Sequence, residues 1–164
     1  TPRGKFITLE GGEGAGKSTL LAGLLDVLEG RGISVVQTRE PGGTPVGEAV
    51  RAIVLDPLMH GLAAETELLL MFASRAQLVR EVIEPAMAAG RWVLCDRYAD
   101  ASFAYQGGGR GQPLARIAEL ERWACDGVQP DLTLLLDRPV ATGRARAAGR
   151  GENDRIEIEA DAIV

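Results

Sequence analysis

Two kinds of segment alternate along this chain, and hydrophobic spacing distinguishes them. Short, mostly apolar runs predict buried strands over residues 5–10, 33–38, 91–96 and 131–137. Between these runs, apolar residues recur every three or four positions, which predicts helices over residues 17–30, 46–55, 65–88 and 114–126. Strands that alternate with helices are typical of a parallel sheet covered by helices. We therefore expect an α/β fold of three layers in a single domain over residues 1–164.

A glycine-rich loop, Gly11-Gly12-Glu13-Gly14-Ala15-Gly16-Lys17-Ser18, joins the first predicted strand to the first helix. It fits the phosphate-binding pattern G-x-x-x-x-G-K-[ST], and a strand before it and a helix after it are the context that this P-loop requires. Its glycines let successive backbone N–H groups converge on phosphate oxygens at the helix N-terminus. Lys17 is expected to reach the β- and γ-phosphates, and the Ser18 hydroxyl to bind Mg²⁺. The alternative is an ordinary glycine turn before a helix.

The composition argues against several other classes of function. The 164 residues carry a net charge of −5, so a basic surface for nucleic acid is not indicated. A single histidine, His60, leaves neither a histidine metal site nor a Ser-His-Asp triad. Cys95 and Cys125 lack CxxC spacing and predict reduced, buried thiols in a cytoplasmic protein. The longest apolar run, residues 68–73, is too short to cross a membrane.

Charged residues gather where the predicted strands end. Arg39 follows the second strand, Asp96 ends the third, and Arg97 follows it. Because open parallel sheets bind ligands at this end and guanidinium groups suit phosphate oxygens, we expect phosphate recognition there. The common alternative for each arginine is a solvated surface charge. Asp96 is placed to hold a Mg²⁺-bound water, and Asp137, at the end of the fourth strand, competes for that role.

The segment over residues 138–157 is basic, with few large apolar residues. We expect it to act as a lid over transferring phosphates, and a basic linker is the alternative. The guanine-reading N-K-x-D motif is absent, because Asn153 is the only asparagine, which argues against a small GTPase.

Five motifs, in order along the chain, resemble those of bacterial thymidylate kinases, which belong to the P-loop nucleoside monophosphate kinases. They are FITLEGGEGAGKST (6–19), TREPGGT (38–44), DRY (96–98), SFAYQGGGRG (102–111) and RGENDRIE (150–157). The resemblance implies a cytoplasmic enzyme that uses ATP and Mg²⁺ to phosphorylate dTMP to dTDP in dTTP synthesis. It also implies a homodimer, and neither nucleic acid nor a membrane is expected as a partner.

The resemblance further implies roles for individual residues in ATP binding and catalysis. The catalytic residues would be Glu13, Lys17, Asp96, Arg97 and Arg150, and Ser18 and Asp96 would hold the metal. Arg150 would act as the lid arginine, because Gly14 stands where another subtype of the family carries an arginine. The ATP-binding residues would be Gly11, Gly12, Glu13, Gly14, Ala15, Gly16, Lys17, Ser18 and Thr19.

Binding of dTMP is the third set of roles that the resemblance implies. Arg39 and Arg97 would grip its phosphate, and Arg51 would line the pocket. Tyr105 would lie against the deoxyribose, and Phe72 would stack on thymine from the position next to Met71, where the family usually has the stacking phenylalanine. The residues at the thymine edge would be Arg75, Ser102 and Gln106.

The similarity ends near residue 158, where the family continues with a further helix, a fifth strand and a terminal helix. Residues 157–164 do not match that continuation, so we expect the fifth strand and C-terminal helices to be missing from this chain. Two alternative functions stay open at this point. One is a kinase for another nucleoside monophosphate, such as a guanylate- or cytidylate-type enzyme, and the other is a nucleotide-dependent switch that acts through a partner.

Overall fold

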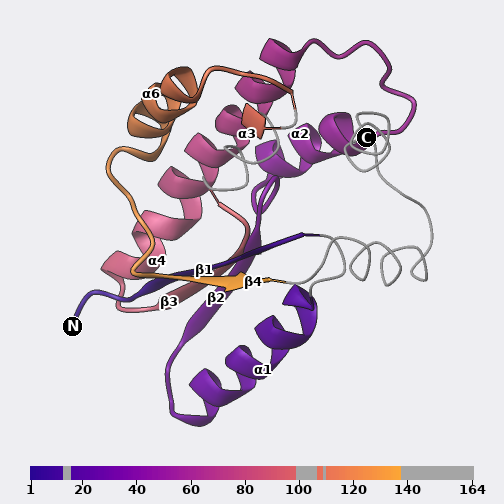
Figure 1. Ribbon diagram of the computed structural model, residues 1–164. Helices are drawn as coiled ribbons and strands as arrows, with labels where there is room; N and C mark the ends of the chain where they lie inside the picture. The colour runs from indigo at the N-terminus through magenta and orange to yellow at the C-terminus, as the bar shows by residue number, and fades with distance from the viewer. Residues whose placement is uncertain (13–15, 99–106, 109, 138–164) are drawn as a thin grey trace.

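The computed structural model describes residues 1–12, 16–98, 107–108 and 110–137, and its centre is a parallel sheet. The four strands of these residues lie in the order β2-β3-β1-β4 (Figure 1). Their bounds are Phe6–Gly11 for β1, Val35–Arg39 for β2, Trp92–Asp96 for β3 and Leu132–Leu136 for β4. The strands predicted from the sequence are confirmed, with ends that move by two residues or fewer. The sequence also predicts a short helix over residues 102–105, which lie outside the described residues.

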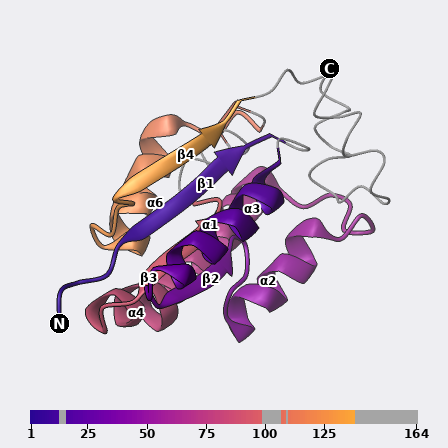
Figure 2. The same cartoon turned by 90° about the horizontal axis from the view of Figure 1, so that it is seen from below.

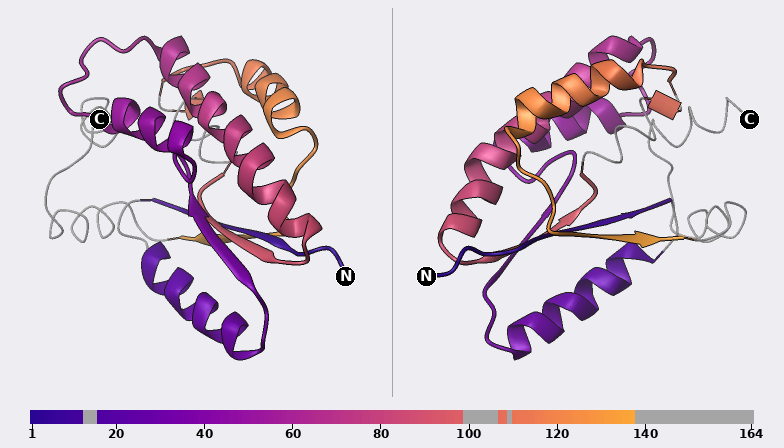
Figure 3. Two further views of the ribbon diagram at one scale, coloured as in Figure 1. Left: turned by 180° about the vertical axis from the view of Figure 1, so that it is seen from behind. Right: turned by 60° about the vertical axis from the view of Figure 1, so that its left-hand side comes forward.

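Helices cover both faces of the sheet, so the predicted three-layer α/β fold is confirmed. Helix α1, Lys17–Gly30, is the only described helix on one face, and Figure 2 shows it from that side. The described helices of the opposite face are α2 (Pro45–Leu55), α3 (Ala64–Leu78), α4 (Glu84–Ala88) and α6 (Leu114–Cys125), as both views of Figure 3 show.

Strand β1 divides its side chains between two hydrophobic cores, one on each side of the sheet. Phe6 points to the core beneath α3 and α4, whereas Ile7 and Leu9 pack against the leucines of α1. This alternation follows from the period of two in a β-strand. The α1 leucines at positions 20, 21, 24, 25 and 28 all belong to the second core, as their helical spacing predicts. Both faces of the central strands β1 and β3 are therefore buried, which is usual for parallel strands.

The helix predicted over residues 65–88 forms without a gap, but its hydrogen-bonding pattern changes near its C-terminal end. A π-helical turn, Val79–Ile83, lies between α3 and α4. Pro85 supplies the physical reason, since it has no N–H to donate to the carbonyl of Glu81 and its ring crowds that carbonyl. A wider turn at this point relieves both problems, so the chain continues into α4 without a sharp break.

Candidate active site

Strands β2 and β3 bring charged residues to the same edge of the sheet, next to the end of β1. In the strand register, Asp96 of β3 lies beside Leu9 of β1 on one side and beside Arg39 of β2 on the other. The backbone N–H of Arg97 donates to the Leu9 carbonyl at 2.9 Å, which continues this arrangement one residue past β3. The predicted gathering of charge at the carboxyl end of the sheet is therefore present in the fold.

Lys17 stands at the point where the glycine-rich loop becomes α1. Its Nζ donates to the Gly11 carbonyl at 3.2 Å and lies 3.4 Å from Asp96 Oδ1. Gly16 caps the helix with φ 96°, a left-handed conformation that glycine adopts without steric cost. The loop thus presents a lysine and the N-terminal N–H groups of a fourteen-residue helix together, which is an arrangement suited to phosphate.

Asp96 and Ser18 are oxygen donors that line one cavity of about 670 Å³. Within the described part of the chain, the buried Oδ1 of Asp96 accepts no hydrogen bond, and its contact with Lys17 is an ion pair. A carboxylate and a hydroxyl next to a phosphate-binding loop are ligands that Mg²⁺ accepts, because it takes few protein ligands and completes its shell with phosphate oxygens and water. These two residues therefore fit a magnesium ion. Asp137 is exposed and lies beyond β4.

Arg39 also lines this cavity, and its side chain is half exposed. Its Nη2 and Nε approach the Glu48 carboxylate at 2.9 and 3.4 Å. Glu48 also accepts the Gly43 N–H at 2.9 Å. The hydrogen bond from Arg39, followed by the one from Gly43, lowers the pKa of the Glu48 carboxyl below its ordinary value. Arg51, one turn further along α2, donates to the Pro41 carbonyl at 2.9 Å.

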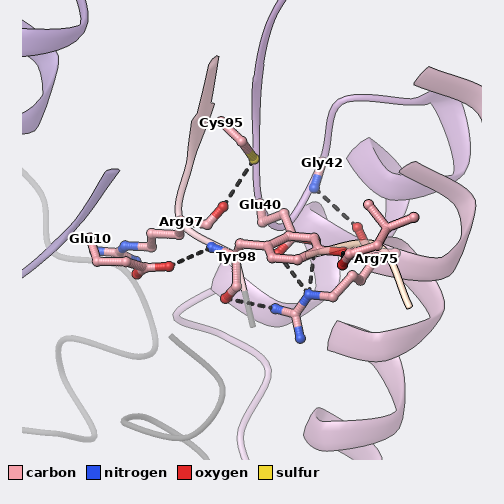
Figure 4. Close-up of polar contacts among 9 residues, drawn as sticks. Glu10, Glu40, Gly42, Arg75, Cys95, Arg97 and Tyr98 are labelled. Atoms are coloured by element: carbon pink, nitrogen blue, oxygen red, sulfur yellow. Dashed lines mark hydrogen bonds and ion pairs between the residues drawn. The ribbon is translucent and has the colours of Figure 1, made fainter. Parts of the chain in front are cut away.

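Arg75 differs from Arg39 in its exposure to solvent, because its side chain is fully buried. Its Nε lies 2.9 and 2.8 Å from the two carboxylate oxygens of Glu40, and its Nη2 donates to the Tyr98 carbonyl at 3.1 Å (Figure 4). The guanidinium carbon lies 4.7 Å from the Phe72 ring centroid and 5.5 Å from that of Tyr98. Burial raises the pKa of the Glu40 carboxyl above its ordinary value, and the charge and hydrogen bonds of Arg75 oppose this shift.

The loop after β3 is tied to β1 by a second buried carboxylate. Glu10 accepts the backbone N–H of Tyr98 at 2.8 Å, and the Cys95 thiol donates to the Arg97 carbonyl at 2.9 Å. Arg97 has a φ of 70°, which is uncommon for a residue with a side chain and recurs where function demands a particular backbone. Its side chain points away from Arg75 (Figure 4).

Phe72 lies in the helical core, with 3% of its surface exposed. It packs with Leu68, Ile117 and Ala124, and its ring supports the Arg75 guanidinium. Met71 packs on the other side of α3, in the cluster of Val50 and Val54.

Several predicted site residues lie outside the described residues. They are Glu13, Gly14 and Ala15 of the glycine-rich loop, Ser102, Tyr105 and Gln106, and Arg150 with the predicted lid over residues 138–157. Conversely, Glu10 and Glu40 are not among the residues predicted for the site. The alternation of a strand indicates that Glu40 is buried. Thr38 and Glu40 flank the exposed Arg39, and a period of two places both of them on the buried face.

Comparisons with known proteins converge on one family. A family profile described as thymidylate kinase matches residues 9–163. The thymidylate kinase of Bordetella pertussis is 56% identical over 163 residues, which cover 99% of this chain and 77% of the relative. That of Chromohalobacter salexigens is 59% identical over 162 residues, with 98% and 76% covered. The crystal structure of thymidylate kinase from Ehrlichia chaffeensis superposes with a TM-score of 0.75 at 37% identity, covering 90% of this chain and 84% of the other.

Proposed function

The chain belongs to the thymidylate kinase family, which consists of ATP-dependent dTMP kinases, and from this premise we propose which of its residues carry the reaction. The proposal rests on one observation above the others. A P-loop lysine, Lys17, lies 3.4 Å from the strand-end carboxylate of Asp96, at the edge of the sheet where phosphates bind in P-loop enzymes.

ATP is assigned to the glycine-rich loop. Backbone N–H groups of residues 11–19 hold its phosphates, and Lys17 neutralises charge on the β- and γ-phosphates. Ser18 and Asp96 would hold Mg²⁺, which would supply positive charge to offset the charge that develops on the phosphates during transfer. Glu13 and the lid arginine Arg150 complete the catalytic set by similarity to the family.

The phosphate of dTMP is assigned to Arg39 and Arg97, with Arg51 beside them. A phosphate oxygen of dTMP attacks the γ-phosphorus in line, a new P–O bond forms, and the bond from the γ-phosphorus to the β,γ-bridging oxygen breaks as ADP leaves. Little covalent work falls to the protein, so positioning and charge neutralisation carry the catalysis. Arg75 is assigned to reading the base, with Ser102 and Gln106 at its edge, Tyr105 against the sugar and Phe72 stacking on thymine, by similarity to the family.

Two properties beyond the reaction belong to the same proposal. A homodimer is supported by large apolar side chains that stay exposed on three helices of one face: Ile53 of α2 at 38%, Leu69 of α3 at 57% and Trp123 of α6 at 80%. A cytoplasmic location is supported by two buried, unpaired cysteines, Cys95 and Cys125. Among the described residues, every helix is too short or too polar to span a lipid bilayer.

A coupled assay of ADP release, with and without dTMP, tests the proposal. The wild-type protein should release ADP only when dTMP is present, and a panel with dUMP, dCMP and dGMP should give lower kcat/KM values. Lys17→Ala should abolish turnover in a protein that still folds, as circular dichroism and thermal unfolding would verify. ATP hydrolysis that ignores dTMP would instead favour a nucleotide-dependent switch, and a preference for another monophosphate would favour a related kinase.

A further inference from the structure

One buried carboxylate at the strand ends has no role in the proposed reaction. Glu40 follows β2 directly, and its side chain is 2% exposed, while that of Arg75 is 0% exposed. Both carboxylate oxygens lie within 2.9 Å of Arg75 Nε. Removing a carboxylate and a guanidinium from water is costly, and a pair of apolar side chains of similar size often stabilises a fold equally well. This pair therefore suggests a function other than stability.

The contacts around Arg75 fix the direction of its guanidinium group. This group is planar and rigid, so holding two of its nitrogens determines where the third one points. Glu40 takes Nε, and the Tyr98 carbonyl takes Nη2 at 3.1 Å. The rings of Phe72 and Tyr98 stack against the same group, which leaves its plane little freedom to tilt (Figure 4).

Glu40 also connects this arginine to the phosphate-binding edge of the sheet. Its backbone N–H donates to the Asp96 carbonyl at 3.0 Å, so the two residues keep a fixed separation. Two residues later, the Gly42 N–H donates to the Ser74 hydroxyl at 3.1 Å, which is a second polar contact between the same loop and α3. The loop after β2 thus links the strand that ends at Asp96 to the helix that carries Arg75.

We propose that Glu40 is a positioning residue for dTMP recognition, which holds the Arg75 guanidinium in the orientation that reads the base. The inference rests on the proposed function, because it takes Arg75 as the base-reading residue. Glu40 itself does not touch the substrate. Its loss should weaken recognition of the nucleoside monophosphate and leave the binding of ATP on the other side of the site unchanged.

The decisive variant is Glu40→Gln, which keeps the shape of the side chain and removes its charge. Because hydrogen bonds to charged groups contribute more than neutral ones, KM for dTMP should rise at least about tenfold, with KM for ATP within about twofold of wild type. The preference for dTMP over dUMP should also narrow. On an Arg75→Lys background, the same substitution should cost less than about twofold, because the two residues act through one contact.

Ser74→Ala is the matched control. It removes the neighbouring hydrogen bond from the Gly42 N–H, which joins the same loop and helix, and leaves the Glu40–Arg75 contact intact. It should leave KM for dTMP within about twofold of wild type, even where its unfolding temperature falls, since the loss of one neutral hydrogen bond acts mainly on stability. Should Glu40→Gln fail to fold, Glu40→Asp takes its place, because it keeps the charge but draws it back from Nε by one methylene.

Three results would overturn the proposal: an unchanged KM for dTMP in folded Glu40→Gln, a parallel rise in the KM values of dTMP and ATP, or the failure of both Glu40 variants to fold. The last two would make the pair a structural support only. Failure of the proposed function itself is separate, since it appears as a wild-type protein that does not phosphorylate dTMP.

Discussion

Arg39 and Glu40 are neighbours in the sequence, yet their ion pairs lie in opposite environments. Arg39 meets Glu48 at 2.9 Å with the two side chains 51% and 45% exposed. Glu40 meets Arg75 at 2.8 Å with both side chains almost completely buried. The distances are nearly equal, so the difference lies in the surrounding medium.

This difference separates an arginine that can change partners from one that cannot. In water the attraction between opposite charges is weak and exchange is easy, whereas in a buried site the loss of one partner leaves a charge unsolvated. An exposed pair such as Arg39–Glu48 therefore suits a side chain that must release its carboxylate and grip a phosphate. A buried pair such as Glu40–Arg75 suits a side chain that must keep one orientation.

The largest expected effect is a loss of stability when the buried pair, Glu40–Arg75, is broken. Glu40→Ala should lower the free energy of unfolding by about 3–5 kcal/mol, because it leaves the Arg75 guanidinium buried without its carboxylate. Glu48→Ala should cost less than about 1 kcal/mol, since its partner stays in water. Urea unfolding of both variants measures the contrast. Equal losses would mean that burial does not distinguish the two pairs.

The second largest expected effect is a loss of activity when the exposed arginine, Arg39, is replaced. Arg39→Ala should lower kcat/KM for dTMP by roughly tenfold to a hundredfold, because charge-assisted hydrogen bonds to the phosphate are lost. Its free energy of unfolding should stay within about 1 kcal/mol of wild type. Arg116→Ala, which removes an exposed arginine from α6, is the matched control and should leave steady-state kinetics unaltered. Similar kinetics for the two variants would remove Arg39 from the phosphate site.

The smallest effect is a pH dependence of stability at Glu48. Its folded-state pKa lies below the ordinary value of 4.5, so its ionised form stabilises the fold above that pH. This contribution is lost as the pH falls through the lowered pKa. Between about pH 5 and pH 3, the wild type should therefore lose slightly more stability than Glu48→Gln, by well under about 1 kcal/mol because the pair is exposed. Parallel pH profiles from thermal unfolding would contradict the assignment.

Much of the fold could be predicted because its signals are local. The α1 helix begins at Lys17 and ends at Gly30, as its leucine spacing predicts, and the four strands lie within two residues of their predicted ends. The π-helical turn before Pro85 was not predicted, because hydrophobic spacing does not register a change in the hydrogen-bonding pattern of a helix. The roles assigned to the site residues stay predictions, because they are drawn from motifs. The structure adds the positions of those site residues that it describes.

The phosphate-binding loop and the family can be recognised from the sequence alone. The motif from Gly11 to Ser18 carries its chemistry in adjacent residues, so no distant contact is needed to recognise it. The partners of Arg39 and Glu40, by contrast, depend on how the chain folds. Glu48 is nine residues from Arg39, but Arg75 is thirty-five residues from Glu40 and reaches it only because α3 packs over the end of the sheet. Burial then sets the strength of each pair, and burial is a property of the whole fold.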